Sequence, residues 1–392
     1  MLSMGLNLIN DKKMIKIIRA TTVPGSLNNF CRGMLKELSE RYEVVALSSP
    51  GEAMQEIKER EGVRTIAVPM ERHISFLKDC KSLLKLIIVF HKEKPMMVHS
   101  MTPKAGMLCM VAAWLTRVPV RVHTFTGLVF PTSTGIKRKI LMCTDRLTCR
   151  CATHIIPEGE GVKNDLLNNK ITKKPLKVLG YGNVRGIDMQ FYSRRAEVIR
   201  KMEELGLRDD NKFTFLFVGR IVRDKGINEL VKAFLRLQET NKDACLILVG
   251  GYEDSLDPIS EETREAICNN PGIKAVGRKG GDELLAYYAA ADCYVQTSYR
   301  EGFPNTVIEA GAMGLPSIVT DINGSREIIV QGENGVIVPS KNVDALYNAM
   351  WTMANHHEER TAMAAKARQM IADRFEQSYV RKCLYDFYEQ IL

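Results

Sequence analysis

Two glutamates, Glu301 and Glu309, are spaced so that both could contact the hydroxyl groups of one bound ligand. They lie in the stretch REGFPNTVIEAGAMGLPSIVTD, residues 300–321. A helix predicted to begin at Asn305 places Glu309 about one turn inside it, where a carboxylate can accept hydrogen bonds from a vicinal diol such as a ribose. Glu301, in the loop ahead, can reach a hydroxyl further along the same ligand. Ordinary surface charge is the alternative for two glutamates at this spacing.

The start of that helix offers a second set of ligand contacts. We predict Asn305 as the N-cap residue and Gly314 with Pro316 as the stop signal. Amides at a helix start point outward and can bind phosphate or sugar oxygens. The residues expected to face a ligand here are Gly302, Phe303, Pro304, Asn305 and Thr306.

The segment FVGRIVRDKG, residues 217–226, predicts an anion site. Gly219 permits a tight turn after a strand, and Arg220 and Lys225 can converge on one anion at the start of the next helix. A diphosphate fits such a pair of cations. A solvated basic loop explains this segment equally well when it is considered alone.

The first half of the chain contributes one candidate histidine and two loops. His123 ends a predicted strand in VHTFTGLVF, which turns at Gly127. Folds with parallel strands present their chemistry at the carboxyl ends of strands, which makes His123 the best candidate in this half. Gly25 and Ser26 open a helix after the first predicted strand and are candidate acceptor-side loop residues.

Short β-branched runs alternate with helix-length segments through nearly the whole chain. This alternation predicts an α/β fold with parallel sheets covered on both faces. We predict strands at residues 15–19, 43–47, 63–68, 96–100, 118–125, 153–157, 176–180, 213–219, 245–250, 272–277, 292–298 and 316–320.

The alternation pauses at residues 181–212, which are rich in charge and poor in strand signal. A chain of 392 residues exceeds the size of a single core, so the pause predicts a boundary between two doubly wound domains. We predict an acceptor-binding domain at 14–195, a nucleotide-binding domain at 205–375, and a terminal helix at 376–392 that crosses back to the first domain.

The net charge of +9 is distributed unevenly. Residues 1–195 carry 32 Lys and Arg against 16 Asp and Glu, a balance of +16, whereas the rest carries 23 against 30, a balance of −7. The basic half predicts an anionic partner, and without a zinc-finger or RNP-type pattern nucleic acid is the weaker candidate.

One predicted helix, residues 135–151, gathers much of this charge beside apolar residues. A basic amphipathic helix can lie on an anionic bilayer, and a packed domain helix with a solvated face fits equally well. The basic residues predicted to face a membrane are Lys137, Arg138, Lys139, Arg146 and Arg150.

Several classes are disfavoured. No apolar run approaches the length of a membrane-spanning helix, and no secretory signal is visible, so we expect a cytoplasmic protein, in part peripheral on the inner face of the plasma membrane. The ten cysteines show no zinc-binding spacing. No G-x-G-x-x-G follows a strand at the start of either predicted domain, which argues against a dehydrogenase. We expect neither a metal nor a cofactor.

The two motifs of the second half resemble those of the retaining glycosyltransferases of family 4, which have the GT-B architecture of two facing Rossmann-like domains with a donor cleft between them. Residues 300–321 resemble the family's E-x7-E signature, and residues 217–226 its phosphate-binding Arg and Lys. The resemblance implies that Arg220 and Lys225 neutralise the diphosphate of a nucleotide sugar. It also implies that Glu309 holds the ribose and Glu301 the transferred sugar.

The resemblance extends to three further assignments. It implies that Arg278 lies beside the base and that His123 contacts the donor sugar near the reacting carbon. In place of the double glycine common in the family, this chain has Gly25 and Ser26, which is similar to enzymes that elongate polyprenyl-diphosphate-linked glycans.

The resemblance implies a metal-independent hexosyltransferase that retains the anomeric configuration by a same-face mechanism. We expect a UDP-sugar carrying a hexose or N-acetylhexosamine as donor and a glycan or polyprenyl-diphosphate-linked glycan as acceptor, in the biosynthesis of a cell-surface polysaccharide such as a capsule. A nucleotide-sugar epimerase and a non-catalytic, membrane-docked assembly partner of the same fold are the alternatives.

Overall fold

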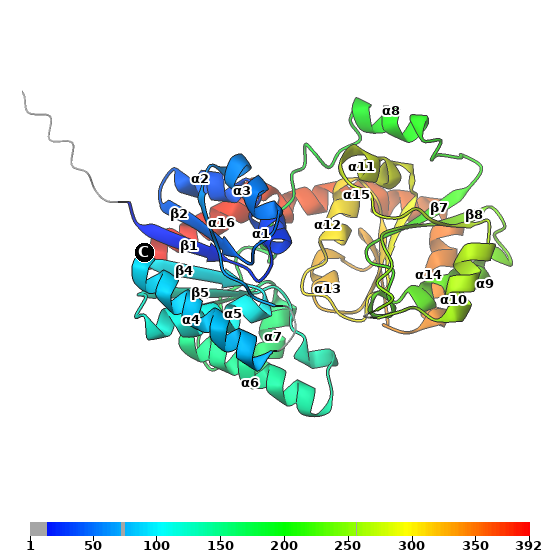
Figure 1. Cartoon of the computed structure of the whole chain (residues 1–392). Coiled ribbons are helices and arrows are strands. Elements are labelled where there is room, and N and C mark those ends of the chain that lie inside the picture. The colour runs from blue at the N-terminus through cyan, green and yellow to red at the C-terminus, as the bar shows by residue number, and fades with distance from the viewer. Residues whose placement is uncertain (1–13, 72–74, 256) are drawn as a thin grey trace, which may run out of the picture. The chain divides into compact units, whose positions relative to one another are not determined.

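The computed structural model describes residues 14–71, 75–255 and 257–392. These residues divide into two compact units, each with its own parallel sheet (Figure 1). The first unit comprises the described residues of Met1–Thr124 together with Met142–Ile155 and Glu389–Leu392, and the second comprises Phe125–Leu141 and Ile156–Tyr388. The predicted ranges 14–195, 205–375 and 376–392 stay predictions.

The first sheet has the strand order β3-β2-β1-β4-β5-β6. The printed registers between its neighbouring strands are parallel, as the alternation of strands and helices predicts. Its strands are β1 (Lys16–Ala20), β2 (Glu43–Ser48), β3 (Arg64–Ala67), β4 (Met97–Met101), β5 (Val120–Phe125) and β6 (His154–Pro157).

The second sheet has the order β12-β11-β10-β7-β8-β9, which is the same doubly wound topology repeated. In both sheets the first strand lies beside the fourth, and there the winding direction reverses. The strands are β7 (Phe213–Val218), β8 (Ala244–Val249), β9 (Ile273–Ala275), β10 (Cys293–Gln296), β11 (Ser317–Thr320) and β12 (Gly335–Val338).

Eleven of the predicted strands are confirmed, and the prediction at residues 176–180 is wrong. None of these five residues is buried, so the run has no core face to stabilise a strand. The sequence reading also missed β12, a four-residue strand that follows a turn.

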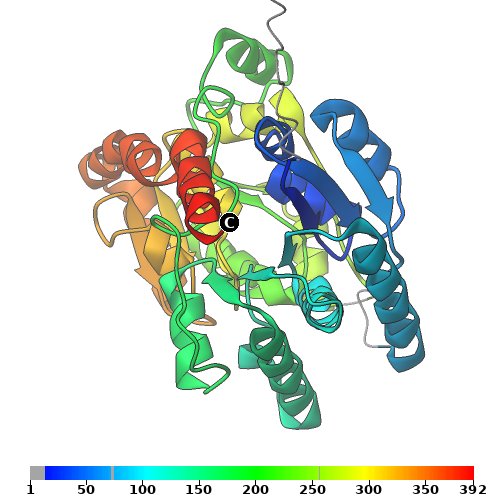
Figure 2. The ribbon, with the colours of Figure 1, turned by 90° about the vertical axis from the view of Figure 1, so that its left-hand side faces the viewer.

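Helices cover both faces of each sheet (Figures 1 and 2). In the first unit and the segments beside it they are α1 (Pro24–Cys31), α2 (Met34–Ser39), α3 (Ala53–Glu61), α4 (Phe76–Glu93), α5 (Pro103–Leu115), α6 (Gly135–Cys151) and α7 (Glu160–Asn168). The later ones are α8 (Ala196–Glu204), α9 (Ile227–Gln238), α10 (Glu261–Asn269), α11 (Gly281–Ala290), α12 (Asn305–Ala312), α13 (Ser325–Ile328), α14 (Val343–Asn355), α15 (His357–Phe375) and α16 (Gln377–Ile391).

The second sheet separates two apolar cores. Along β7, Phe215 and Phe217 point into the core shared with α9 and α14, whereas Leu216 points into the core shared with α11, α12 and α15. This alternation follows from the two-residue repeat of a strand. Burial on both faces fixes the strand register and hence the loops at the strand ends.

Candidate active site

Two loops at the carboxyl ends of β7 and β10 form the candidate site. The strands are hydrogen-bonded neighbours, so the loops that follow them lie side by side at the point where the winding reverses. The Thr297 hydroxyl donates to the Lys225 carbonyl at 2.8 Å, and the Tyr299 amide donates to the Asp224 carbonyl at 2.9 Å. Ligands of open α/β sheets bind at such a switch point.

Glycines allow the close approach of backbone in these loops. Gly226 has φ 69°, and a Cβ there would lie 2.0 Å from the Thr297 carbonyl oxygen. At Gly250 a Cβ would lie 1.7 Å from the carbonyl oxygen of Gly219. A side chain at Gly226 would therefore push apart the loops after β7 and β10, and one at Gly250 would push apart the loops after β7 and β8.

The structure brings Lys225 and Glu301 together. The Lys225 ammonium donates to Glu301 Oε1, which also accepts from Gln296 Nε2 at 2.9 Å and from the Ser298 hydroxyl at 2.8 Å. Among the described residues, no group donates to Glu301 Oε2. This oxygen is therefore available to a ligand hydroxyl.

Gln296 is held in one orientation by its own neighbours. Its Oε1 accepts from the Tyr294 hydroxyl and from the Thr306 hydroxyl, each at 2.8 Å. Both bonds occupy the amide oxygen, which leaves the Nε2 group directed at Glu301. Burial raises the pKa of Tyr294, so its hydroxyl keeps the proton that it donates.

Glu309 is surrounded by three donors. Oε1 accepts from Arg185 and from the Tyr192 hydroxyl, both at 2.9 Å, and Oε2 accepts from the Tyr288 hydroxyl at 3.1 Å. A carboxylate has about four acceptor positions. One position on Oε2 therefore remains for a ligand. The sequence predicted that Glu309 would accept hydrogen bonds from both hydroxyls of a diol, and the structure leaves room for one.

The donors around Glu309 are one guanidinium and two phenols. Burial followed by the nearby Glu309 carboxylate raises the pKa of Tyr192 and of Tyr288, so both phenols act as donors. Burial alone would lower the pKa of Arg185, but Glu309 and Tyr192 raise it. The guanidinium and the carboxylate thus form a charged pair whose side chains are 18% and 8% exposed.

Arg220 and Arg278 share one carboxylate. Arg220 contacts Glu253 at 2.7 Å, and Arg278 lies 4.0 Å from the other oxygen of Glu253. Their side chains are 48% and 75% exposed, so both cations remain accessible to a ligand.

The predicted helix start is displaced by one residue. The N-cap of α12 is Pro304, and Asn305 is its first helical residue, so the predicted N-cap is wrong. The Asn305 side chain accepts instead from Asn183 at 2.9 Å. Phe303 packs into the core against Phe375 with ring centroids 5.5 Å apart, so this stretch presents mainly its backbone.

Gly302 and Gly127 lie where an added side chain would meet neighbouring backbone. A Cβ on Gly302 would lie 2.3 Å from the Thr126 carbonyl oxygen, and a Cβ on Gly127, which has φ 125°, would lie 3.1 Å from Gly302 Cα. Both positions therefore require glycine for steric reasons.

His123 and the first loop lie in the first unit. The imidazole of His123 is 1% exposed, its Nδ1 is 2.9 Å from the Ser100 hydroxyl, and Gly106 makes room for its ring. Burial lowers the pKa of His123 to about 3, so the ring is neutral. Gly25 and Ser26 lie in the first turn of α1. The catalytic role of His123 and the acceptor role of this loop stay predictions.

The predicted membrane-facing residues lie on α6, whose bounds match the prediction. Ile136 is 78% exposed beside exposed Lys137 and Lys139. Arg138 instead donates to Asn169 at 2.7 Å and lies over the Phe130 ring. Arg146 and Arg150 are exposed on the same helix.

The sequence reading missed the residues that hold the glutamates. Gln296 is the last residue of β10 and Ser298 lies two residues after it. The end of a strand is a place where ligands bind, and this position was their only signal. Arg185 and Tyr192 lie in the irregular segment before α8, and no local pattern marks them.

Glu158, directly after β6, is a further missed carboxyl group. It is 3% exposed, and burial followed by the carboxylates of Glu327 and Glu301 raises its pKa well above the ordinary value. Burial and the two neighbouring carboxylates therefore favour the protonated form of the Glu158 carboxyl.

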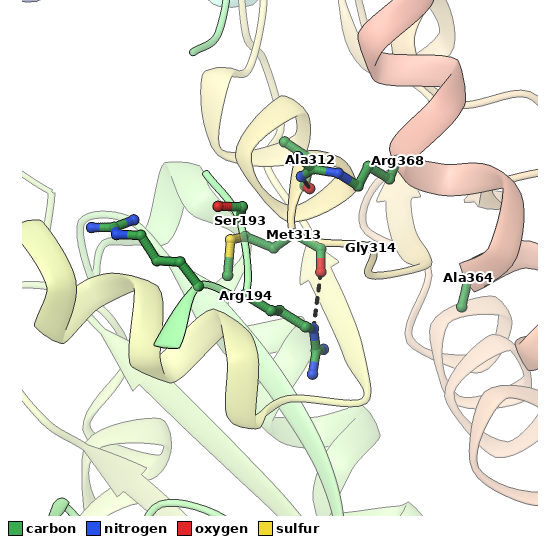
Figure 3. Close-up of a pocket in the computed structure, with 8 residues that line it drawn as sticks. Ser193, Arg194, Ala312, Met313, Gly314, Ala364 and Arg368 are labelled. Carbon is green, nitrogen blue, oxygen red and sulfur yellow. Dashed lines mark hydrogen bonds between the residues drawn. The ribbon is translucent and has the colours of Figure 1, made fainter. Parts of the chain in front are cut away.

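The helix that carries Glu309 is fixed at its far end beside a depression of about 570 Å³ (Figure 3). Arg368 donates to the carbonyls of Ala312, Tyr192 and Met189, and Arg194 donates to the carbonyl of Met313 at 3.3 Å. These arginines satisfy carbonyls at the carboxyl end of α12 and are thereby engaged in the fold.

Two further findings concern the described residues only. No helix among them is long and apolar enough to cross a membrane. Within the same residues, no group of three or more His, Cys, Asp or Glu side chains is placed to hold a metal ion.

Comparison with known proteins places these features in a family context. The family model of glycosyl transferases group 1 matches residues 199–370, and that of the glycosyl transferase 4-like domain matches residues 25–182. A capsular polysaccharide biosynthesis glycosyltransferase of Staphylococcus aureus is 31% identical over 96% of this chain and 97% of its own length.

Two other similar proteins extend the comparison. A UDP-Gal:alpha-D-GlcNAc-diphosphoundecaprenol alpha-1,3-galactosyltransferase of Escherichia coli is 28% identical over 74% of each chain. The solved structure of Anabaena HepE in complex with UDP has a TM-score of 0.79 at 17% identity and covers 96% of this chain and all of that one. This last likeness concerns the fold.

Proposed function

Because the chain belongs to the group 1 glycosyltransferases with the GT-B fold, we propose that it transfers a hexose or N-acetylhexosamine from a UDP-sugar to a hydroxyl of a glycan or lipid-linked glycan. The observation that carries the proposal is the pairing of Lys225 with Glu301 at the carboxyl ends of two adjacent central strands. The named activities of the Staphylococcus and Escherichia relatives support a place in the biosynthesis of a cell-surface polysaccharide.

In this proposal the cations stabilise the leaving group. Cleavage of the bond between the sugar and the diphosphate develops negative charge on the diphosphate. Lys225 and Arg220, with the backbone amides at the start of α12, would bind that charge as prepared donors. Because these cations supply the stabilisation, we propose that the transfer needs no metal ion.

Glu301 and Glu309 orient the donor from two points. Glu301 Oε2 would accept a hydrogen bond from a hydroxyl of the transferred sugar. The remaining position on Glu309 Oε2 would accept from one ribose hydroxyl, while Arg185 and Tyr192 keep the carboxylate in place. Arg278 is proposed to lie beside the base.

We propose that the anomeric configuration is retained. Protein donors hold Glu301 and Glu309, and the proposal uses their remaining acceptor positions for donor hydroxyls, so it assigns neither of them as a nucleophile. This arrangement supports a same-face transfer in which a donor phosphate oxygen accepts the proton of the acceptor hydroxyl. His123 is proposed to contact the donor sugar from the first unit.

Ligand-dependent thermal unfolding tests the donor site. We expect UDP or a UDP-sugar to raise the midpoint of the wild type, since ligand at 100 times its dissociation constant adds about 2.7 kcal/mol. Glu309→Ala should lose this response. Glu333→Ala, at an exposed glutamate of the same unit, is the control and should keep it.

A second assay separates the enzyme from a non-catalytic partner of the same fold. Purified protein with a UDP-sugar and no acceptor should release UDP slowly, as transfer to water, and faster when a polyprenyl-diphosphate-linked sugar is added. Binding of UDP without release under either condition would favour the assembly partner. Conversion of the donor sugar without release of UDP would favour an epimerase.

A further inference from the structure

The helix α4 presents an unusually apolar surface to solvent. Phe76 is 79% exposed, Leu77 81%, Leu84 62% and Ile88 66%, and all four lie on this one helix of the first unit. Isolated exposed apolar residues are normal, but a contiguous group marks an interaction surface. The group needs a partner that covers it.

The spacing gathers these side chains into one stripe. At about 100° per residue, the four apolar residues and the exposed Cys80 fall within about 120° of the helix circumference. His91 lies in the same arc near the carboxyl end of the helix. Side chains at i and i+4, here Leu84 and Ile88, are direct neighbours on a helix, so the stripe is continuous.

A row of lysines borders the stripe. Lys78, Lys81, Lys85 and Lys92 fall in the adjoining arc of about 60° at the same angular spacing. All four are exposed. Lys78 pairs with Glu71, whereas Lys81, Lys85 and Lys92 have no ion pair within the described residues.

The carboxylates of α4 point away from this surface and form ion pairs with residues outside the helix. Asp79 pairs with Lys104 at 2.5 Å, and Glu93 pairs with Lys16 at 3.0 Å and with Arg64. The hydrogen bond from Arg64 lowers the pKa of Glu93 to about 2, so Glu93 stays ionised within this cluster. The outer face therefore carries cations with no anion of the helix to offset them.

We propose that α4 binds the surface of an anionic lipid bilayer. An apolar stripe beside lysines is the composition of a helix that lies in the membrane interface, with apolar side chains among the acyl chains and ammonium groups at the phosphates. A second copy of the chain fits less well, because the same arc of the copy offers cations and no carboxylate. This proposal does not depend on the identity of the donor or acceptor.

Vesicle flotation with the full chain tests the proposal. We expect the wild type to float with vesicles of phosphatidylcholine and phosphatidylglycerol, and not with phosphatidylcholine alone. Lys81→Gln with Lys85→Gln should weaken binding about 25-fold, from about 1 kcal/mol for each lysine at an anionic surface. Leu77→Gln with Leu84→Gln and Ile88→Gln should weaken it at least tenfold, because apolar burial is lost.

Matched variants guard against unspecific effects. Two control variants change exposed residues of the second unit and should leave flotation unchanged. The control for the lysines is Lys242→Gln with Lys274→Gln, and the control for the apolar stripe is Leu205→Gln with Val330→Gln. All variants should keep the wild-type thermal midpoint and UDP response, which separates loss of membrane binding from loss of fold or donor site.

Three outcomes would overturn the proposal. The wild type could fail to float with either vesicle. The α4 variants could float as well as the wild type, while a double variant of α6, Lys139→Gln with Arg146→Gln, fails to float. This result would place membrane binding on α6 alone. Light scattering could show a wild-type dimer that the stripe variant dissociates, which would assign the stripe to a second copy.

Discussion

At Glu309, one carboxylate serves both the fold and, in the proposed function, the ligand. Three protein donors already fix its oxygens, and one acceptor position remains. A group fixed in this way loses little entropy when a ligand binds. The donors around Glu309 should therefore influence donor binding although the proposal does not place them at the ligand.

Tyr192→Phe tests this influence. The change removes one hydrogen bond to Glu309 and keeps the ring, so we expect the KM for the donor to rise about fivefold with kcat nearly unchanged, from about 1 kcal/mol for one hydrogen bond. Steady-state kinetics measure both constants. Tyr347→Phe, which removes a hydroxyl with no hydrogen-bond partner among the described residues, is the control. Equal KM values in wild type and Tyr192→Phe would show that Glu309 does not touch the donor.

Lys225→Gln tests the leaving-group cation. Loss of a prepared charge at the departing diphosphate should reduce kcat by a factor of about 100 to 1,000. Lys274→Gln, at an exposed lysine of the same unit, should retain full activity. A Lys225→Gln enzyme with wild-type kcat and a raised KM alone would restrict Lys225 to ground-state binding.

The sequence predicted those site residues whose chemistry depends on short spacings. Glu301 and Glu309 were found eight positions apart, and Lys225 five positions after Arg220. Arg185, a partner of Glu309, was not found, because it lies more than a hundred residues from Glu309 along the chain and meets it only through the fold. The roles assigned to the predicted residues stay predictions.

At the scale of the elements, glycines let the loops of the site approach one another closely. Gly302→Ala would place a methyl group 2.3 Å from the Thr126 carbonyl oxygen, so backbone must move. We expect the variant to fold and to lose the stabilisation by UDP in a thermal-shift assay, because the amides beside Gly302 shift with it. Gly280→Ala has open space around the added methyl and should respond as the wild type does. If UDP stabilises Gly302→Ala as much as the wild type, the loop can move to accept the methyl group without weakening UDP binding.

Element boundaries show where local signals suffice. Strong apolar runs such as residues 213–219 became strands because they are buried on both faces. The run at 176–180 has similar β-branched character but no buried face, and exposure is not visible in a single run. The start of α12 was displaced by one residue because proline, at its N-cap, has the fixed φ that permits the helix to begin directly after it.

For the whole molecule, one buried acid should make stability depend on pH. Burial raises the pKa of Asp145 on α6 to about 7 from its ordinary 3.8. The folded chain thus holds a proton that the unfolded chain releases, so the contribution of Asp145 is fully present below about pH 4 and is lost as pH rises towards 7. The free energy of unfolding should fall over this range.

Asp145→Asn removes this dependence. We expect the variant to be more stable than the wild type at pH 8, by up to about 4 kcal/mol at 1.36 kcal/mol per pKa unit, and the difference to shrink towards pH 4. Urea unfolding at pH 4, 6 and 8 measures it. Asp243→Asn changes an exposed carboxylate and should show no such trend. If the difference in the free energy of unfolding between Asp145→Asn and the wild type is the same at all three pH values, the effect comes from packing and not from titration.

The ion pairs of the candidate site have a consequence for ionic strength. Lys225 and Arg220 already have counter-ions within the protein, Glu301 and Glu253. A diphosphate that binds there exchanges one anion for another, whereas lysines on α4 would release mobile ions to the solution when they meet a charged lipid surface. Added salt should therefore detach the protein from vesicles while changing the donor KM little. Raising the salt concentration would then yield a dispersed enzyme that still turns over a water-soluble acceptor.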